Sequence, residues 1–191
     1  MNRIPLYHAD VFTLQNVGTD AEVNDLLKQI RDENIAHPDT TARTNPGCWR
    51  SNKFWNNMNW LGTAVADLVD QAVDYYTTVD PTFKKPTGQH KFDLWTNVND
   101  TGSRNVFHAH KTANFSAVYY LRAENTGNLR FANPANLLTD CNPAGPFTRD
   151  FYFTPKDKDL ILWPAWMPHE VEPNPNSQVR VNIAFDIYLS Y

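Results

Sequence analysis

Three of the six histidines in this chain have the spacing of a metal site. His108 and His110 are separated by one residue in the segment FHAHK, and His169 comes just before the last long segment of alternating apolar residues. Residues two apart on an extended strand point to the same face, so both imidazoles can converge on one point. Imidazole binds iron, zinc, copper and nickel, so the spacing predicts a metal without selecting one. The other histidines are isolated, and we expect surface or structural roles for them: His8, His37 and His90.

An arginine lies on the polar face of that last segment, residues 178–189. Its apolar face holds Val179, Val181, Ile183, Phe185 and Ile187, and its other face holds Arg180, Asn182, Ala184 and Asp186. If the apolar residues pack outward, Arg180 points inward and needs an anionic partner, because an unpaired buried charge is very costly. The partner could be Asp186, in an internal salt bridge. The alternative is a small dicarboxylate ligand, with one carboxylate on the metal and the other gripped by the guanidinium.

The N-terminal half of the chain predicts two helices that support the site. A short first strand is expected over residues 4–13, and Thr19 or Asp20 can cap a first helix whose apolar residues recur at helical spacing. Residues 35–57 indicate a loop that Trp49, Phe54 and Trp55 pin down. A second amphipathic helix runs from about Trp60 to Tyr76.

After Pro86 the pattern changes to short strands separated by turns. The expected strands are 90–98, 104–109, 114–122, 128–132, 149–154, 159–163, 168–172 and 178–189. Two helices followed by these strands predict an α+β fold in which the strands form a sandwich or barrel and the helices cover one face. We expect one domain over 1–191, with a helical support region at 1–88 and a β core at 89–191.

Composition excludes several classes of protein. No basic block points to nucleic acid, and no apolar run has the length of a membrane span. Cys48 and Cys141 form no CxxC motif, so neither a disulfide framework nor a zinc knuckle is indicated. The expected location is the cytoplasm, and homo-oligomerisation is left open.

The catalytic half resembles the 2-oxoglutarate and Fe(II)-dependent oxygenase superfamily, in particular a bacterial and phage branch. The resemblance covers roughly residues 89–189 and rests on four segments: FHAHKTANFSAVYYL, NLRF, DLILWPAWMPHEVEPN and RVNIAF. It implies a double-stranded β-helix, the jelly-roll core also found in cupins. It also implies an enzyme of a bacterial or phage-infected cell, with Fe(II) as metal and 2-oxoglutarate as co-substrate.

The resemblance assigns roles to individual residues. His108 and His169 correspond to metal ligands, and Arg180 to the arginine that binds the far carboxylate of 2-oxoglutarate. Asn182 stands where a serine is usual, and Tyr120 resembles a strand tyrosine that contacts the same carboxylate. Asn97, in LWTNVND, lies on the strand that leads into the first histidine and is expected to line the pocket.

One departure from the family pattern concerns His110. The superfamily usually has two histidines and one carboxylate, and His110 stands where the carboxylate would be. As a ligand it would give the iron site one more positive charge; the alternative is water or a halide in that position. The implied reaction converts 2-oxoglutarate and O2 to succinate and CO2 while an unidentified substrate is hydroxylated.

Two other classes remain open from the sequence. A cupin would share Gly102 followed by His108-Ala-His110, but it usually adds a glutamate shortly after, where this chain has Lys111 to Phe115. A non-catalytic β-sandwich module would use the histidines structurally or not at all. The substrate is not readable, and its specificity is expected in loops 36–57 and 133–148. Trp163 and Trp166 are expected either to wall the metal site or to fill the core.

Overall fold

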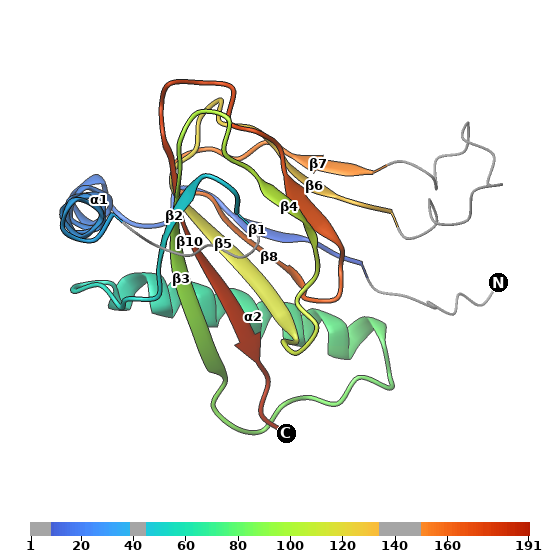
Figure 1. Cartoon of the computed structure of the whole chain (residues 1–191). Helices are drawn as coiled ribbons and strands as arrows, with labels where there is room; N and C mark the ends of the chain where they lie inside the picture. Colours follow the sequence, from blue (N-terminus) through green and yellow to red (C-terminus); the bar gives the residue numbers. More distant parts are fainter. Residues whose placement is uncertain (1–8, 39–44, 134–149) are drawn as a thin grey trace, which may run out of the picture.

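The computed structural model describes residues 9–38, 45–133 and 150–191, in which two antiparallel sheets face each other (Figure 1). The larger sheet has the strand order β1-β8-β5-β10-β3-β2, and the smaller one has the order β4-β9-β6-β7. In chain order the elements are β1 (Phe12–Leu14), α1 (Asp20–Ala36), β2 (Cys48–Ser51), α2 (Asn59–Val79), β3 (Lys91–Asn99), β4 (Asn105–His108), β5 (Phe115–Arg122), β6 (Leu129–Phe131), β7 (Phe151–Phe153), β8 (Leu160–Pro164), β9 (His169–Val171) and β10 (Arg180–Tyr188). The predicted α+β fold with a double-stranded β-helix core is confirmed.

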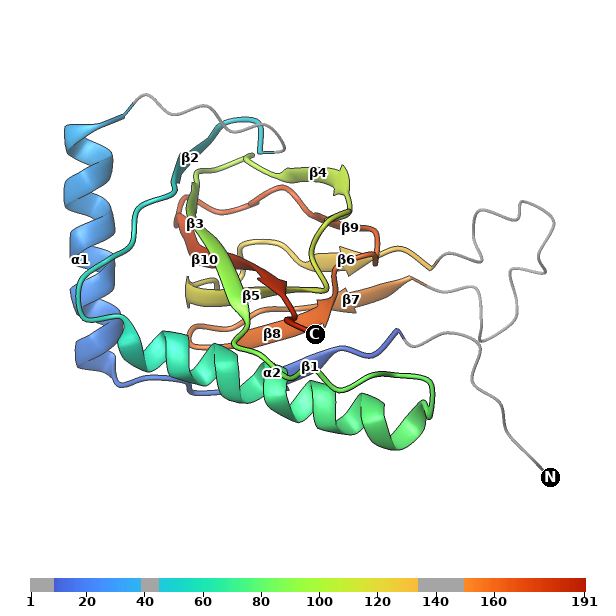
Figure 2. The ribbon, with the colours of Figure 1, turned by 90° about the horizontal axis from the view of Figure 1, so that it is seen from below.

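Helix α2 lies along the outer face of the larger sheet, and α1 stands beside the sheet on the side of β2 and runs in a different direction (Figure 2). Helix α1 begins as expected at Thr19, which forms a capping box: the Thr19 hydroxyl accepts from the Glu22 N–H, and the Glu22 carboxylate accepts from the Thr19 N–H. Leu26 of α1 and Leu61 of α2 are fully buried in the core that the helices share with the sheet. Neither helix is long and apolar enough to cross a membrane, as judged over the described residues.

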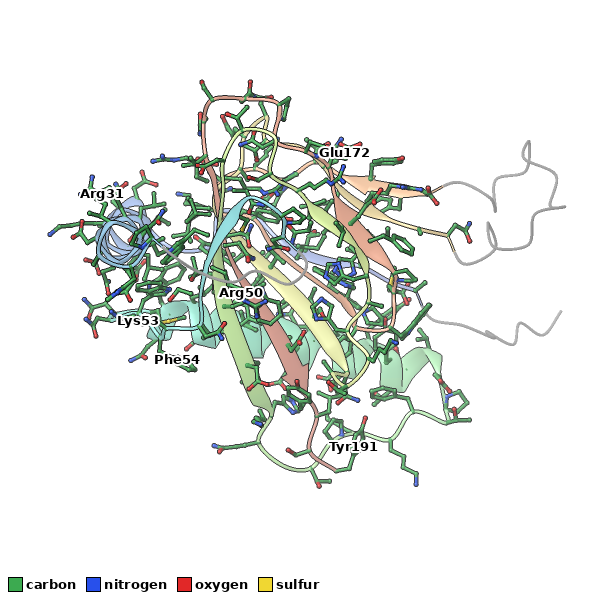
Figure 3. The ribbon with its side chains drawn as sticks, in the orientation of Figure 1. Arg31, Arg50, Lys53, Phe54, Glu172 and Tyr191 are labelled. Atoms are coloured by element: carbon green, nitrogen blue, oxygen red, sulfur yellow. The ribbon has the colours of Figure 1, made fainter. Side chains whose placement is uncertain are left out.

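The segment expected to be a loop, 35–57, contains the short strand β2. Four residues are too few to show the alternation of apolar and polar side chains that predicts a strand. In the structure β2 pairs with β3 and covers an edge that would otherwise present unpaired backbone groups. Of the three aromatic residues expected to pin this segment, Trp49 and Trp55 are buried. Phe54 is 68% exposed, so that expectation is wrong for it (Figure 3).

Strand β10 lies in the middle of the larger sheet, between β3 and β5. The predicted alternation is confirmed: Val181, Ile183, Phe185 and Ile187 pack in the core under the helices, while Arg180, Asn182, Ala184 and Asp186 line the space between the sheets. The first strand differs from the expected segment 4–13, since β1 covers only Phe12–Leu14; residues 4–8 of that segment lie outside the described residues. The remaining expected strands all form, with bounds that differ by one or two residues.

Candidate metal centre

The three histidines of the predicted site come together between the two sheets. Their ligand nitrogens all lie within 4.8 Å of one another. His108 on β4 and His169 on β9 are direct partners in the smaller sheet, and their ring centroids are 4.4 Å apart. His110 lies two residues beyond the end of β4, so strand geometry alone does not place it. Its backbone N–H donates to the carbonyl oxygen of Ala165 at 3.0 Å, which anchors this turn against the chain leading into β9.

Backbone carbonyls orient two of the rings. His108 Nδ1 lies 2.6 Å from the oxygen of Val106, and His169 Nδ1 lies 2.9 Å from the oxygen of Met167. A carbonyl can only accept, so Nδ1 carries the proton in both rings and Nε2 keeps its lone pair for a metal. Burial lowers the pKa of His169 to about 3 and also lowers the pKa of His108. Both imidazoles are therefore neutral near pH 7, the form in which they bind metals.

The third ring has a carboxylate partner instead. His110 Nδ1 lies 2.8 Å from Oδ1 of Asp186, which projects from β10 in the opposite sheet. The His110 ring stacks against His169 at 5.2 Å with an interplanar angle of 3°, and against Trp95 on its other side at 5.8 Å. This pairing overturns one of the two partners considered for Arg180, because Asp186 is bonded to His110.

A cavity of about 310 Å³ adjoins the histidines. All seven residues singled out from the sequence line it: His108, His110, His169, Arg180, Asn182, Tyr120 and Asn97. Its wall also includes Trp163, whose edge meets the face of His169 at a centroid distance of 5.0 Å. Trp163 is 1% exposed, so it both fills the core and walls the site, whereas Trp166 is 46% exposed and lies outside the lining.

Arg180 is fully buried, yet it has no ion pair with any described residue. Its Nη1 donates to the carbonyl oxygen of Thr126 at 3.1 Å, while Nε and Nη2 have no hydrogen-bond partner among the described residues. Burial lowers the pKa of Arg180, which is the effect of removing a cation from water without a counter-charge. A guanidinium with two unused donors in a cavity has the geometry to bind a carboxylate.

Polar groups beside Arg180 are pre-arranged. The amide of Asn97 donates to Oδ1 of Asn182 at 2.9 Å, and Asn45 donates to Oδ1 of Asn97 at 2.8 Å. Tyr120 is 2% exposed, and burial raises the pKa of its phenol, so the hydroxyl keeps its proton and remains a donor. The sequence did not indicate a role for Asn45, because it belongs to a short polar stretch far from Asn97 and Asn182 in the chain.

Two residues that were not predicted from the sequence, Trp95 and Arg50, also line the cavity, on the side of β2. The guanidinium carbon of Arg50 lies 4.6 Å from the ring centroid of Trp95, which in turn stacks on His110. Figure 3 labels Arg50, on β2 in front of β3 and β10. In the sequence Arg50 belongs to a segment that indicated a loop, so nothing connected it with the histidines.

Comparison with known proteins identifies the fold independently. The chain is similar to a prolyl-4-hydroxylase of Pseudomonas putida, with a TM-score of 0.66 and 15% identity over 95% of this chain and 93% of that one. It is also similar to SnoN, a non-heme alpha ketoglutarate dependent epimerase from nogalamycin biosynthesis, with a TM-score of 0.66 and 15% identity over 94% of this chain and 76% of that one. A third similar structure is HygX from Streptomyces hygroscopicus with nickel and 2-oxoglutarate bound, with a TM-score of 0.58 and 11% identity over 96% of this chain and 84% of that one. At these identities the likeness shows the fold.

Sequence comparison addresses the family. No curated protein matches the sequence significantly. Residues 93–186 match the family described as "Putative 2OG-Fe(II) oxygenase", and this span includes the three histidines and Arg180. Residues 93–186, the segment that carries the three histidines and Arg180, therefore belong to the 2-oxoglutarate/Fe(II)-dependent oxygenase superfamily, and the protein is a dioxygenase of that kind.

Proposed function

We propose that this enzyme hydroxylates its substrate at a carbon held beside an Fe(II) that His108, His110 and His169 bind. The observation that carries the proposal is the orphaned guanidinium of Arg180 in the same cavity as three imidazoles whose ring nitrogens lie within 4.8 Å of one another. A metal site alone would fit several chemistries, whereas a metal site with a buried carboxylate receptor fits a co-substrate with a carboxylate at each end. Fe(II), with 2-oxoglutarate and O2, supplies the oxidising power for hydroxylation, with succinate and CO2 as by-products.

The residues around Arg180 bind and orient the co-substrate. Arg180 Nε and Nη2 are the donors available to its far carboxylate. Tyr120 offers a phenolic O–H, and Asn182 occupies the position next but one along β10. The Asn97 amide holds the oxygen of Asn182, which leaves the Asn182 N–H groups to face the ligand. Such a pre-arranged set costs little reorganisation when the ligand enters.

His108 and His169 require no proton transfer to accept the metal. His108 and His169 are neutral in the folded protein, and carbonyl oxygens already hold the Nδ1 proton of each. Trp163 and Phe131 pack around His169, with ring centroids 5.0 and 6.1 Å from the imidazole. These rings exclude water from one side of the site, so the reaction is confined to the open part of the cavity.

The loops expected to select the substrate are 36–57 and 133–148, of which residues 39–44 and 134–148 lie outside the described residues. We further propose a single domain over 1–191, with 1–88 as support for the β core at 89–191. A cytoplasmic location, in a bacterial or phage-infected cell, is inferred from the resemblance and from the two cysteines, which form no CxxC motif in the sequence.

The test is an anaerobic titration of metal-free protein with Fe(II) and 2-oxoglutarate, followed by visible absorbance. We expect a charge-transfer band that requires both additions. His169→Ala removes the band by abolishing Fe(II) binding. Arg180→Met keeps Fe(II) binding and weakens 2-oxoglutarate binding by roughly 100-fold, since two hydrogen bonds to a charged group are lost. Arg122→Met is the matched control, because Arg122 is a cation of β5 that does not line the cavity.

The outcomes separate the readings. Fe(II) binding without any response to 2-oxoglutarate would favour a cupin-type metal enzyme. Absence of Fe(II) binding in folded wild-type protein would rule out the oxygenase role of this site. Equal 2-oxoglutarate affinity in Arg180→Met and Arg122→Met would remove Arg180 from the binding site.

A further inference from the structure

Asp186 is the only carboxylate among the described residues that line the metal cavity. It lies on β10, on the same face as Arg180 and Asn182, and it is largely buried, with 16% of its side chain exposed. Its Oδ1 is 2.8 Å from Nδ1 of His110. A buried carboxylate needs compensating donors or charge, so its environment indicates what it is for.

A second donor holds the same oxygen in place. Ser116 on β5 is the direct partner of Asp186 across the β5–β10 pair, and the Ser116 hydroxyl donates to Oδ1 at 3.1 Å. The carboxylate is therefore positioned from the side of the sheet and presents one oxygen to His110. With both partners on neighbouring central strands, this arrangement is as rigid as the sheet itself.

Among the three imidazoles, His110 is the one that most needs such support. His108 and His169 lie on paired strands and donate to backbone carbonyls, whereas His110 lies beyond the end of β4. Flat contacts with Trp95 and His169 restrict the tilt of its ring, but stacking does not decide which nitrogen faces the metal. The bond to Asp186 decides it, because a carboxylate oxygen requires the proton on Nδ1 and leaves Nε2 free.

We propose that Asp186 is a positioning residue that holds His110 as the third metal ligand and supplies, one hydrogen bond away, the negative charge that a carboxylate ligand supplies directly in the common two-histidine site. This inference rests on the proposed function of the three histidines. Three neutral imidazoles leave both positive charges of Fe(II) uncompensated by protein. The carboxylate bonded to His110 makes that ring a stronger donor and brings one negative charge close to the ion.

The experiment measures the affinity of the metal alone, with no co-substrate or turnover. Metal-free wild type, Asp186→Asn and Asp186→Ala are titrated anaerobically with Fe(II) by calorimetry, after circular dichroism has shown that each is folded. Loss of a partner of this kind typically lowers metal affinity 10- to 100-fold. We expect about 10-fold for Asp186→Asn, which keeps an acceptor oxygen but no charge, and a larger loss for Asp186→Ala.

Asp93→Asn is the matched control. Asp93 lies directly opposite Asp186 on β3, but its carboxylate is half exposed and its ion pair is with Lys91 at 4.0 Å. Its removal takes the same charge from the neighbouring strand without touching His110 through any described contact. We expect Fe(II) affinity within about twofold of wild type, since exposed charges are screened by solvent.

A second series tests whether Asp186 acts through His110. In His110→Asp a carboxylate is restored as a direct ligand, and Asp186 then faces another anion in place of an imidazole N–H. Adding Asp186→Asn to this variant should no longer weaken Fe(II) binding, because the interaction it removes is already gone. A purely structural role would give the same loss in both backgrounds.

The possible results are distinct. Wild-type affinity in Asp186→Ala, with the protein folded, would overturn the inference and leave the proposed function intact. An equal loss in Asp93→Asn would attribute the effect to general charge and would also overturn it. If wild type binds no Fe(II), the proposed function fails and this inference fails with it.

Discussion

Tyr120 and Asn182 are direct partners across β5 and β10, and the register of this strand pair shifts by one residue immediately beyond them, between Val181 and Asn182. The shift lies next to Arg180, at the end of the strand pair that borders the cavity. Bulges of this kind commonly re-aim side chains beside active sites. Tyr120, Asn182 and Arg180 all line the cavity beside this shift.

Replacing Tyr120 by Phe should weaken 2-oxoglutarate binding about 10-fold and leave Fe(II) binding unchanged. A hydrogen bond to a charged group contributes about 1.5–3 kcal/mol, and tenfold in affinity corresponds to about 1.4 kcal/mol. The control is Tyr119→Phe, because Tyr119 points to the other face of β5 and donates to the carbonyl oxygen of Val17 at 2.7 Å. Calorimetric titration of the metal-loaded proteins measures both, and equal affinities in the two variants would exclude Tyr120 from the binding site.

Trp163→Phe should separate packing from hydrogen bonding at the wall of the site. The indole N–H of Trp163 is buried without a partner among the described residues, although the ring packs edge-on against His169. Phe keeps an aromatic ring there and loses the donor. We expect Fe(II) affinity within about threefold of wild type and a roughly fivefold loss in 2-oxoglutarate affinity, since an unpaired buried donor gains from a ligand acceptor.

An unchanged 2-oxoglutarate affinity in Trp163→Phe would assign the indole to packing alone. Trp163→Ala then measures how much the packing of the whole side chain contributes to stability. It should destabilise the protein by about 3–5 kcal/mol, the usual loss when a large aromatic side chain is deleted from a core. Urea denaturation measures this difference.

Gly127→Ala should lower both stability and 2-oxoglutarate affinity. Gly127 has a φ of +96°, and a Cβ there would lie 2.7 Å from the backbone oxygen of Glu172. The strain is expected to cost about 1–3 kcal/mol in the free energy of unfolding. Relief by backbone movement would displace Thr126, whose carbonyl oxygen accepts from Arg180.

Gly62→Ala should raise stability, in contrast to Gly127→Ala. Gly62 is in α2, and a Cβ there would meet no atom within 4 Å. Alanine should therefore stabilise the helix by about 0.5–1 kcal/mol through its higher helix propensity. Urea unfolding of both variants tests the pair, and a stable Gly127→Ala protein with wild-type co-substrate affinity would contradict the prediction.

Cys48 should make folding stability depend on alkaline pH. Burial raises the pKa of its thiol from 9.0 to about 11. Between these values the unfolded chain releases the thiol proton and the folded chain keeps it, so stability present below pH 9 is lost as pH rises towards 11. The slope for one group is at most about 1.4 kcal/mol per pH unit.

The measurement is urea unfolding at pH 8 and pH 10 of metal-free protein carrying Cys141→Ser. Cys48→Ala in the same background should show a smaller decline between the two pH values. The folded thiol should also react slowly with a thiol reagent at pH 8, and the urea-unfolded chain should react quickly. Fast modification of the folded protein would show that the thiol is not shielded.

Much of this site is present in the local pattern of the chain. The alternation along β10 assigns Arg180 and Asn182 to one face and Val181 to the other, because side chains on a strand alternate without regard to what surrounds them. The capping residues of α1 and the apolar stripe of α2 are equally local. The spacing of His108, His110 and His169 predicts a metal without selecting one.

Other features arise only when distant strands meet. The sequence offered Asp186 as a partner for Arg180 because both share a face. The sheets instead bring Asp186 to His110, and Arg180 has no carboxylate partner among the described residues. Strand β2 likewise forms because β3 has an open edge, not because its four residues prefer it.

The physical reason for this division is the range of the interactions. Periodicity, caps and turns depend on neighbours within a few residues, so the chain determines them by itself, and with them the inward face that carries the site. Which carboxylate reaches which imidazole depends on strand register and on the packing of one sheet against the other. His110, lying past the end of its strand, is placed by Ala165 and Asp186, and only the folded β-helix brings those two residues to it.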